Sequence, residues 1–446
     1  MSRTTSAALG LGVAIASSSF FVSFNRADAA PIPYTFQLQA RASVGSGATT
    51  FNLPSGSAFS SATPDINNNR RVTFKPLLNG ATGNEAIWYG GVGAGSLGTG
   101  GIVYDGAGGA ALSDPSINNN NMVVFPQTFS SANGIYKFDA GTGSTTLFTN
   151  QPVGAQSWSS PRINNLNQVG TRANFGAGQQ FVSYGPAGGA ATVHASNVDA
   201  DSTSPYSFLF TPNFDDNRNV YGVARVGPAG SSGDATRPDQ IRRFGIGASS
   251  IVVEDRDSNA ASPYFQFDNS VGVSDNGQWV AFVARTTTAA SSRSVFVTDG
   301  TITRTVAVPG TGLTSIDNFT PAVNNSGLVT FRATDLSGRI SVFVGDGTEL
   351  QRVIGVGDPI QTDIGTFNIN SLGGNPTIND LGDIAFGGGL GSGGNFIAVA
   401  LAPEPSSVAL LALSGISLLL RRRHDGAFTP SSCTQGEGGG DGAFLL

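Results

Sequence analysis

The stretch that decides the fold is Ile378-Asn379-Asp380-Leu381-Gly382, followed at once by Asp383-Ile384-Ala385-Phe386. An apolar anchor, an Asn- or Asp-rich turn and a second apolar run occur in this order seven times. The other six copies start at the anchors Ile66, Ile117, Ile163, Phe214, Val273 and Val323. Neighbouring anchors lie 46 to 59 residues apart, and most copies place Phe eight positions after the anchor. Seven such copies indicate a tandem repeat.

Each repeat unit carries a second pattern after the first. The run 294–298 ends at Asp299-Gly300, and another apolar run, 301–308, follows it; residues 341–356 repeat this arrangement around Asp346-Gly347. Asp-Gly between alternating apolar runs is a strong hairpin signal, because the turn needs a positive φ. The Asn-rich phrase is a turn for the same reason, since Asn and Asp tolerate left-handed backbone. Each unit is therefore predicted to be a four-stranded meander.

Four-stranded units repeated seven times are typical of a β-propeller. The seventh unit has only three strands, ending with residues 395–402, whereas residues 34–44 form a strand that belongs to no unit. We predict an all-β, seven-bladed β-propeller of four-stranded blades over residues 30–401, in which the N-terminal strand completes the last blade. Closure of the ring removes exposed sheet edges. The Phe, Val and Ile residues of the repeats are expected to form the core between the sheets.

The composition agrees with this fold and excludes some functions. Charged residues make up 12% of the 446 residues, and the chain has 61 Gly and 22 Pro. Helical proteins fill their surfaces with Glu, Lys and Arg, and the low fraction of charged residues therefore argues against a helical fold. A net charge of −6 provides no basic surface for nucleic acid.

The N-terminal residues predict export. Arg3 precedes an apolar run over residues 7–24, and Ala27-Asp28-Ala29 supplies small residues at an A-x-A cleavage position. Residues 1–29 are therefore predicted to be a signal peptide, with Ala27 and Ala29 as the small residues of one cleavage site.

The C-terminal region combines Pro403-Glu404-Pro405, an uncharged apolar run over residues 408–420, and Arg421-Arg422-Arg423. Thirteen apolar residues are few for a membrane span, which takes about 17–25, and the arginines favour a cytoplasmic end. Residues 402–423 resemble a PEP-CTERM sorting signal. The resemblance implies that Pro403, Glu404 and Pro405 are recognised by an exosortase, with transient membrane anchoring through residues 408–420 and the Arg421–Arg423 cluster beyond it. It also implies a Gram-negative host, an inner-membrane intermediate, and a final location at the cell surface or outside the cell.

The last segment departs from that family pattern, which ends at or just after the arginines. Residues 424–446 are a Gly-rich tail that is predicted to be disordered and carries the only cysteine, Cys433. If this tail is removed with the anchor, the mature protein has no thiol for disulfides or metal sites.

The repeats carry a second resemblance. Asn379 to Phe386 matches the NxxGxxAF tandem repeat, and Asn324 to Phe331 differs from it only at Thr330. This repeat occurs in proteins with varied C-terminal anchors and is similar to the propeller repeats of TolB-like proteins. The first four copies lack the glycine. The resemblance covers roughly residues 60–400 and implies no known activity.

Few residues point to chemistry. His194 is the only histidine before the tail, which excludes histidine triads and multi-histidine metal sites. Asp255, Asp257 and Asn259 are weak metal candidates, since their alternate spacing is that of a calcium loop; Asp199 and Asp201 are weaker ones. Both segments lack the loop's glycine and closing Glu, and a solvated loop is the alternative.

Two further motifs have simpler interpretations. Residues 274–279 resemble a sialidase Asp-box but are one residue short, and they match the Asn-turn repeat better. Residues 90–95 are Gly-rich without the Lys of a phosphate loop, and are expected to be a loop.

Two functions remain after these exclusions. The favoured one is an exported, exosortase-sorted propeller with a non-catalytic interaction or matrix role, without catalytic residues or cofactors. The alternative is a carbohydrate-binding or carbohydrate-active propeller, with or without calcium, that acts on extracellular polysaccharide through a carboxylate-based glycosidase or lyase site. The alternative requires a funnel with clustered acids and Trp or Tyr, and the chain has only three Trp.

Overall fold

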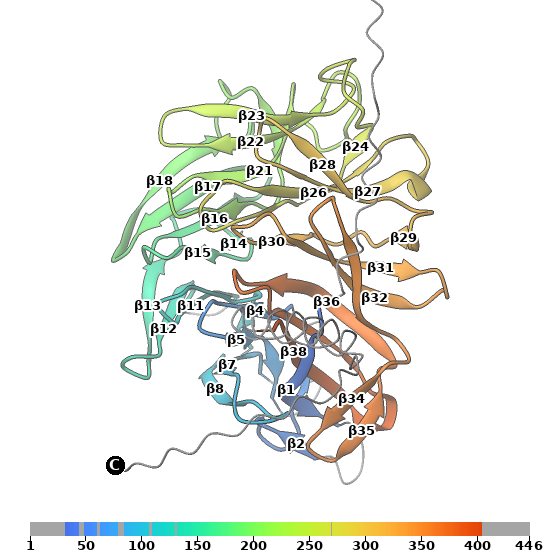
Figure 1. The fold of residues 1–446 in the computed structure, drawn as a ribbon. Helices are drawn as coiled ribbons and strands as arrows, with labels where there is room; N and C mark the ends of the chain where they lie inside the picture. The colour runs from blue at the N-terminus through green and yellow to red at the C-terminus, as the bar shows by residue number, and fades with distance from the viewer. Residues whose placement is uncertain are drawn as a thin grey trace, which may run out of the picture. The chain divides into compact units, whose positions relative to one another are not determined.

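The structure is a computed structural model that describes residues 32–43, 49–59, 63–78, 84–106, 109–129, 132–268 and 270–403. The chain divides into two compact units, Met1–Ile32 and Pro33–Leu446, and the second holds all the strands described below. It is a seven-bladed β-propeller, as the repeats predicted (Figure 1).

The blades follow one another along the chain. Blade one comprises β4 (Asp65–Ile66), β5 (Arg71–Phe74), β7 (Ala86–Gly91) and β8 (Thr99–Asp105). Blade two comprises β10 (Ser116–Ile117), β11 (Met122–Thr128), β12 (Gly134–Asp139) and β13 (Ser144–Asn150), with β9 (Ala111–Leu112) paired to β11. Blade three comprises β14 (Ser157–Trp158), β15 (Arg162–Ile163), β16 (Val169–Phe175), β17 (Gly178–Gly185) and β18 (Gly188–Ser196). Blade four comprises β19 (Tyr206–Leu209), β20 (Asn213–Phe214), β21 (Val220–Val226), β22 (Asp239–Phe244) and β23 (Ser249–Glu254).

The remaining blades repeat the arrangement. Blade five comprises β24 (Gln266–Phe267), β25 (Gly272–Val273), β26 (Val280–Arg285), β27 (Arg293–Thr298) and β28 (Thr303–Ala307), with the 3-10 turn η2 (Ala290–Ser292). Blade six comprises β29 (Leu313–Ile316), β30 (Ala322–Val323), β31 (Val329–Asp335), β32 (Ile340–Gly345) and β33 (Leu350–Gly355). Blade seven comprises β36 (Ser371–Ile378), β37 (Ile384–Gly389), β38 (Asn395–Leu401), β1 (Thr35–Ala42) and β2 (Thr50–Phe51), with η3 (Gly391–Gly393). Two small two-stranded sheets complete the described strands: β3 (Ala58–Phe59) with β6 (Pro76–Leu77), and the hairpin of β34 (Pro359–Thr362) with β35 (Gly365–Asn368).

The N-terminal strand closes the ring, which confirms the prediction. β1 runs antiparallel to β38, in a register from Thr35 opposite Leu401 to Ala42 opposite Asn395. Figure 1 shows the blue β1 beside the red end of the chain at β38. Strand β1 also contacts blade one, because Leu38 N–H donates to Ser96 O (2.9 Å) and Leu38 O accepts from Gly98 N–H (2.7 Å). The first and last blades are thus joined by one strand.

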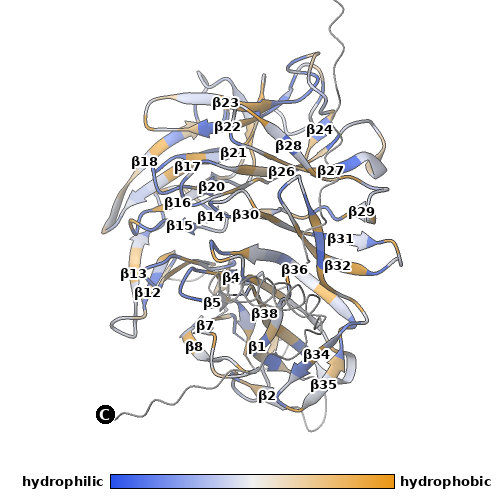
Figure 2. Ribbon diagram, in the orientation of Figure 1, coloured by the Kyte–Doolittle hydropathy of each residue, from blue (hydrophilic) through white to orange (hydrophobic). Residues whose placement is uncertain are grey.

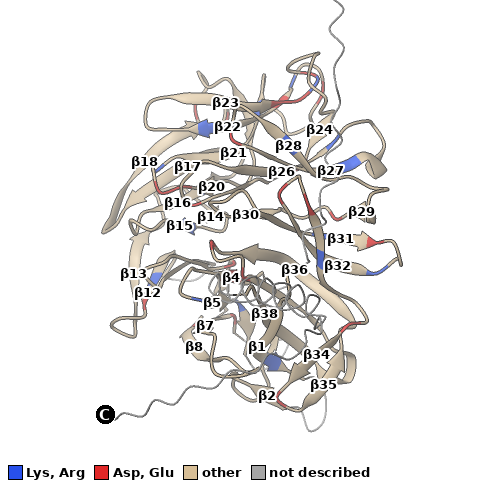
Figure 3. Cartoon of the chain, viewed as in Figure 1, with Lys and Arg blue, Asp and Glu red and all other residues tan. Residues whose placement is uncertain are grey.

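The repeat anchors form the core between blades, also as predicted. All seven anchors are at most 9% exposed, and hydrophobic residues are concentrated in the strands (Figure 2). Charged side chains are sparse over the described chain (Figure 3). Apolar burial between neighbouring sheets is therefore the main stabilising contribution to this fold.

One expectation about a glycine-rich stretch was wrong. Gly90 and Gly91 are part of strand β7 and not of a loop. A Cβ on Gly90 would lie 2.2 Å from the Trp88 ring and 2.3 Å from Thr99 O. The glycine is there because the bulky Trp88 ring occupies the space beside the strand.

Antiparallel strands place two kinds of connection on opposite faces of the ring. The Asn turns lie on one face, here called the turn face, and the connections between blades lie on the other, here called the loop face. Both ends of the propeller are on the turn face: Ala402 N–H donates to Asp383 Oδ1 (2.9 Å), and Tyr34 Oη donates to Gly382 O (3.3 Å).

Candidate functional site

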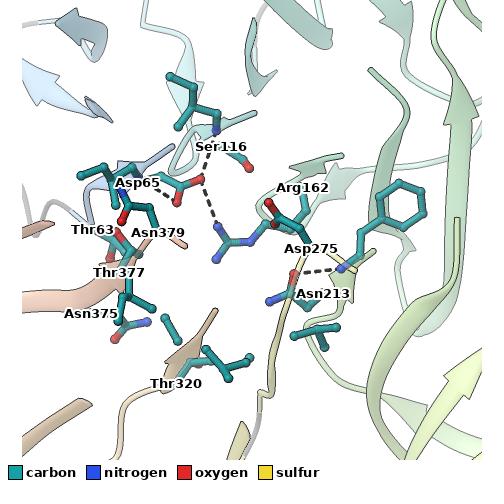
Figure 4. A pocket seen from close by; sticks show the side chains of 18 of the residues that line it. Thr63, Asp65, Ser116, Arg162, Asn213, Asp275, Thr320, Asn375, Thr377 and Asn379 are labelled. Atoms are coloured by element: carbon teal, nitrogen blue, oxygen red, sulfur yellow. Dashed lines mark hydrogen bonds and ion pairs between the residues drawn. The ribbon is translucent and has the colours of Figure 1, made fainter. Parts of the chain in front are cut away.

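A channel of about 270 Å³ runs along the axis between the inner strands of all seven blades (Figure 4). Its wall has layers, because alternate residues of a strand point to the same side. The layer at the loop face consists of Thr63, Asp114, Ser160, Thr211, Ser270, Thr320 and Asn375. The middle layer consists of Asp65, Ser116, Arg162, Asn213, Gly272, Ala322 and Thr377. The layer at the turn face includes Asn68, Asn119, Asp275 and Asp380.

The first Asn of each turn holds its own turn together. Asn379 is 4% exposed, and its Oδ1 accepts from Leu381 N–H (3.0 Å) and Asp383 N–H (2.9 Å). The same pair of bonds occurs at Asn67, Asn118, Asn164 and Asn324. A buried Asn therefore satisfies two backbone donors that the tight turn leaves without strand partners.

The amide nitrogens of these residues bind the next blade. Asn379 Nδ2 donates to Asn67 O (2.9 Å), and Asn67 Nδ2 donates to Asn118 O (2.7 Å). The same bond joins Asn118 to Asn164, Asn164 to Asp215, and Asn324 to Asn379. In the other two copies Asp215 and Ser274 replace the Asn and have no amide to donate.

The second residue of each turn forms a parallel ring. Its backbone N–H donates to the side-chain oxygen of the second residue in the next blade, for example from Asp380 to Asn68 Oδ1 (2.8 Å). The same bond joins Asn68 to Asn119, Asn119 to Asn165, Asn165 to Asp216, and Asn325 to Asp380. The two sides of blade five differ: Asp216 N–H donates to the backbone oxygen of Asp275 (2.7 Å), and Asn276 N–H donates to Asn325 Oδ1 (2.9 Å).

In blade five, one carboxylate therefore takes no part in the ring of hydrogen bonds. Its turn is one residue longer, so the backbone of Asp275 takes the bond that a side chain takes elsewhere. The Asp275 carboxylate instead lies in the channel (Figure 4), where its Oδ2 accepts from Asn165 Nδ2 (3.1 Å). The carboxylate is accessible within the channel, yet the surrounding blades desolvate it, and this desolvation together with the nearby carboxylates of Asp216 and Asp380 raises the pKa of Asp275 to about 6.

Arg162 is the only Lys or Arg among the residues that line this channel. Its Nη1 lies 3.5 Å from Asp65 Oδ2, while Asp65 also accepts from Ile66 N–H (3.1 Å) and Ile117 N–H (3.0 Å). Burial raises the pKa of Asp114, and the charges of Lys75 and Arg162 oppose that rise. Most axial carboxylates are thus engaged with backbone or amide groups of the neighbouring blades.

The weak metal candidates lie in the connection between blades four and five. Asp255 is 4% exposed, and its two oxygens accept from Asp239 N–H and Ser258 N–H (both 2.8 Å). Burial raises the pKa of Asp255 to about 6. Asn259 Oδ1 accepts from Ala261 N–H (3.0 Å), and Asp257 is exposed. Among the described residues no group of three or more His, Cys, Asp or Glu is placed to hold a metal, and a metal role for Asp255, Asp257 and Asn259 stays a prediction.

The second acidic segment is the equivalent connection between blades three and four. Asn197 occupies the place of Asp255: it is fully buried, and its Oδ1 accepts from Gln179 N–H (2.8 Å). Asp201 Oδ1 accepts from the backbone and the hydroxyl of Thr203. Both segments therefore use their Asx residues to shape a loop, and the internal similarity of the two loops was missed at the level of sequence.

A Ser–His pair also escaped the sequence analysis. His194 Nε2 lies 2.8 Å from Ser183 Oγ, and His194 Nδ1 lies 3.2 Å from Gly245 O. Burial lowers the pKa of His194. The distances are those of a nucleophile and its base, but Ser183 is fully buried and also accepts from Arg218 Nε (3.1 Å). The pair joins strands β17 and β18, and the Ser183 hydroxyl is inaccessible to a substrate.

No Trp or Tyr is among the described residues that line the channel, although the carbohydrate alternative required one. Trp88, Trp158 and Trp279 are all buried, at 0%, 4% and 7% exposure. Residues 274–279 form the turn of blade five, where Ser274 Oγ accepts from Trp279 N–H (2.9 Å). The Asn-turn interpretation of this stretch thus agrees with the geometry.

The targeting residues fall almost entirely outside the described part of the chain. Ala27, Ala29, Glu404, Pro405 and Arg421–Arg423 are not described, and Pro403 is the last residue that is. Over the described residues, the structure contains no helix with the length and apolarity that a bilayer crossing requires.

Part of the chain matches the model of a family whose function is unknown. Residues 219–411 match the model of a family of unknown function (DUF7453), a region that includes strands β21 to β38. No curated protein matches the chain.

Solved structures show distant similarity. Oligogalacturonate lyase from Vibrio parahaemolyticus is 11% identical, with 83% of this chain and 99% of that chain covered and a TM-score of 0.49. TolB from Acinetobacter baumannii is 14% identical, with 65% and 62% covered and a TM-score of 0.37. Trypanosoma rangeli sialidase is 11% identical, with 89% and 62% covered and a TM-score of 0.38. Similarities at this level bear on neither substrate nor activity.

Proposed function

We propose that this chain is an exported, non-catalytic β-propeller that acts as a binding scaffold at the cell surface or outside the cell. The observation that carries the proposal is the double ring of bonds around the axis. It engages most of the Asn and Asp side chains of the turns in joining blades, and the Ser183 hydroxyl of the Ser183–His194 pair is fully buried. The polar residues with the right chemistry for catalysis thus have structural partners.

Export and sorting rest on the sequence at the two ends. The signal peptide over residues 1–29 and the PEP-CTERM-like segment over residues 402–423 support a route through the inner membrane with processing by an exosortase. Because both ends of the propeller leave from the turn face, an anchored intermediate would direct its loop face away from the membrane.

Mass spectrometry of the protein from its native host tests this route. We expect an N-terminus at Ala30 and a C-terminus close to Pro403. Replacing Pro403, Glu404 and Pro405 together by Ala should leave the chain in the membrane fraction at its full C-terminal length. A wild-type chain that still carries Arg421–Arg423 at the cell surface would contradict the sorting proposal.

Analysis of reaction products tests the proposal that the protein is not an enzyme. Incubation of the purified chain with polysaccharides should release no reducing ends and no unsaturated sugars. Release that persists through purification to homogeneity would contradict it.

A further inference from the structure

A second hollow, of about 190 Å³, adjoins the channel at its loop-face end. It lies between blades five, six and seven and shares three residues with the channel wall. We call it the rim site, and its lining consists of Asp268, Ser270, Asn318, Phe319, Thr320 and Asn375. Figure 4 shows Thr320 and Asn375 on the shared wall.

Phe319 gives the rim site an open aromatic surface. Its side chain is 39% exposed, although large apolar residues are usually buried. The Arg332 guanidinium lies over the ring, 4.2 Å from its centroid. Arg332 is itself buried and donates to Asp317 Oδ2 (2.8 Å) and to Gly374 O (3.1 Å). The ring is therefore held in place by a fixed cation, which orders it before any ligand arrives.

Asn375 adds an unused acceptor beside this ring. Its Oδ1 is enclosed and has no hydrogen-bond partner within the described structure. Such an atom costs free energy unless a donor satisfies it. Because the atom is enclosed, a ligand hydroxyl that enters the rim site supplies this donor when the partly exposed Asn375 side chain turns toward it.

The charge of the rim site points to a neutral ligand. Asp268 is the only carboxylate of its lining, and it already pairs with Arg293 Nε (2.8 Å). The Asn318 amide, turned so that its nitrogen faces Asp268, donates to the same carboxylate (2.8 Å). The buried Arg332 is likewise paired, so neither charge is left over for an ionic ligand. One carboxylate is also fewer than the two that glycoside hydrolysis normally uses.

We propose that the rim site binds a neutral pyranose unit of a polysaccharide. The C–H face of the sugar packs on the open face of Phe319, and a hydroxyl group donates to Asn375 Oδ1. Open aromatic surface with a few fixed polar groups is the usual make-up of a small-molecule site. The inference rests on the proposed non-catalytic binding function and names its ligand class.

Titration calorimetry with the full chain tests the site, using cellohexaose, maltohexaose, xylohexaose and mannohexaose as probes. We expect at least one of them to bind. Phe319→Ala should weaken that binding at least tenfold, and Phe319→Trp should retain it. Phe129→Ala is the matched control, because Phe129 is a loop-face aromatic at 74% exposure and should leave binding unchanged. Asn375→Ala should weaken binding while the unfolding temperature stays within the range of the control.

The outcomes separate this inference from the proposed function. If none of the four probes binds, or if Phe319→Ala binds as tightly as wild type, the rim site is not a sugar site, while a scaffold role with another partner stands. If a probe binds and is cleaved, the rim site stands and the non-catalytic function falls.

Discussion

At the scale of single residues, the buried Asn that begins five of the seven turns forms both intra-turn and inter-blade hydrogen bonds. Asn118 donates to Asn164 O (2.8 Å) and Asn167 Oδ1 (2.7 Å), and accepts from the backbone of Asn120 and Met122. Asn118→Ala leaves buried donors and acceptors unpaired, so the free energy of unfolding should fall by about 2–4 kcal/mol. Urea denaturation followed by tryptophan fluorescence measures it.

The control for this prediction is two positions away. Asn120 is exposed and donates to Asn165 O (2.8 Å) at the surface. Asn120→Ala should cost less than about 1 kcal/mol, because water replaces the lost bond. Equal losses of unfolding free energy for the two variants would mean that the buried ring of Asn side chains stabilises the protein no more than a surface bond does.

Asp275 is the residue for which pH dependence can be predicted. Its pKa rises from 3.8 to about 6 in the folded protein, so the native state holds a proton that the unfolded chain releases. Stability should therefore fall as the pH rises from about 4 to about 6. Asp275→Asn should match wild type below pH 4 and exceed it above pH 6 by about 1–2 kcal/mol, a value reduced from the full shift because the group meets channel water. Thermal unfolding of both proteins across this pH range checks it, and a pH-independent difference would contradict it.

At the scale of the element, the geometry of the turn explains why four of the seven copies can have a residue other than glycine at the glycine position of the repeat. The fourth turn position has a positive φ in all seven copies, from Arg70, Asn121, Asn167 and Arg218 to Gly277, Gly327 and Gly382. The non-glycine residues compensate through bonds to a neighbouring blade. Arg70 Nε donates to Asp383 Oδ2 (2.8 Å), and Asn121 Oδ1 accepts from Asn67 Nδ2 (2.8 Å).

A glycine copy has no such compensation, which gives a test. Gly382 has φ +84°, and a Cβ there would make only ordinary contacts, with Ala402 at 3.5 Å and Leu328 at 3.9 Å. Gly382→Ala should therefore destabilise by about 1–2 kcal/mol through backbone strain alone. Leu381→Ala in the same turn, exposed at 44%, should stay within about 0.5 kcal/mol of wild type. Thermal unfolding compares the pair, and a neutral Gly382→Ala would refute the strain.

The hairpin β34–β35 depends on one buried ion pair. Arg41 of β1 has a fully buried side chain that contacts Asp363 with Nε (2.6 Å) and Nη2 (2.9 Å). Asp363→Ala should lower the free energy of unfolding by about 3–5 kcal/mol, because it leaves the buried charge of Arg41 without its partner. The double variant Arg41→Met with Asp363→Ala should cost less than the two single changes added together. Additive losses in a double-mutant cycle would show that the pair is not coupled.

Sequence reasoning reached the elements better than the contacts. The seven anchors, the meander and the closing strand follow from local patterns, because turn residues and alternating strand residues are neighbours in the sequence. The small hairpin β34–β35 was missed because it interrupts a connection between blades without repeating. The strand at Gly90 was missed because its cause is the Trp88 ring.

At the scale of the whole molecule, the same limit applies to the sites. Asp275, the Ser183–His194 pair and the rim site bring together residues from different strands, and most of them come from different blades. Spacing along one chain does not report such distances. Asp255 and Asp201 had the spacing of metal ligands, yet their oxygens accept backbone N–H groups, because short Asx side chains shape loops as readily as they bind ions.

The ring depends on its closing strand. Strand β1 pairs with β38, bonds to blade one at Leu38, and buries Leu38, Ala40 and Ala42 completely. A variant without residues 35–42 would expose the edge of β38 and the core of blade seven. This loss is comparable with the roughly 5–15 kcal/mol that keeps a domain folded, so we expect no cooperative unfolding transition in calorimetry. A peptide of residues 33–43 added in trans should restore the transition, and a scrambled peptide should not. A truncated chain that unfolds cooperatively at the wild-type temperature would show that the blades hold together without closure.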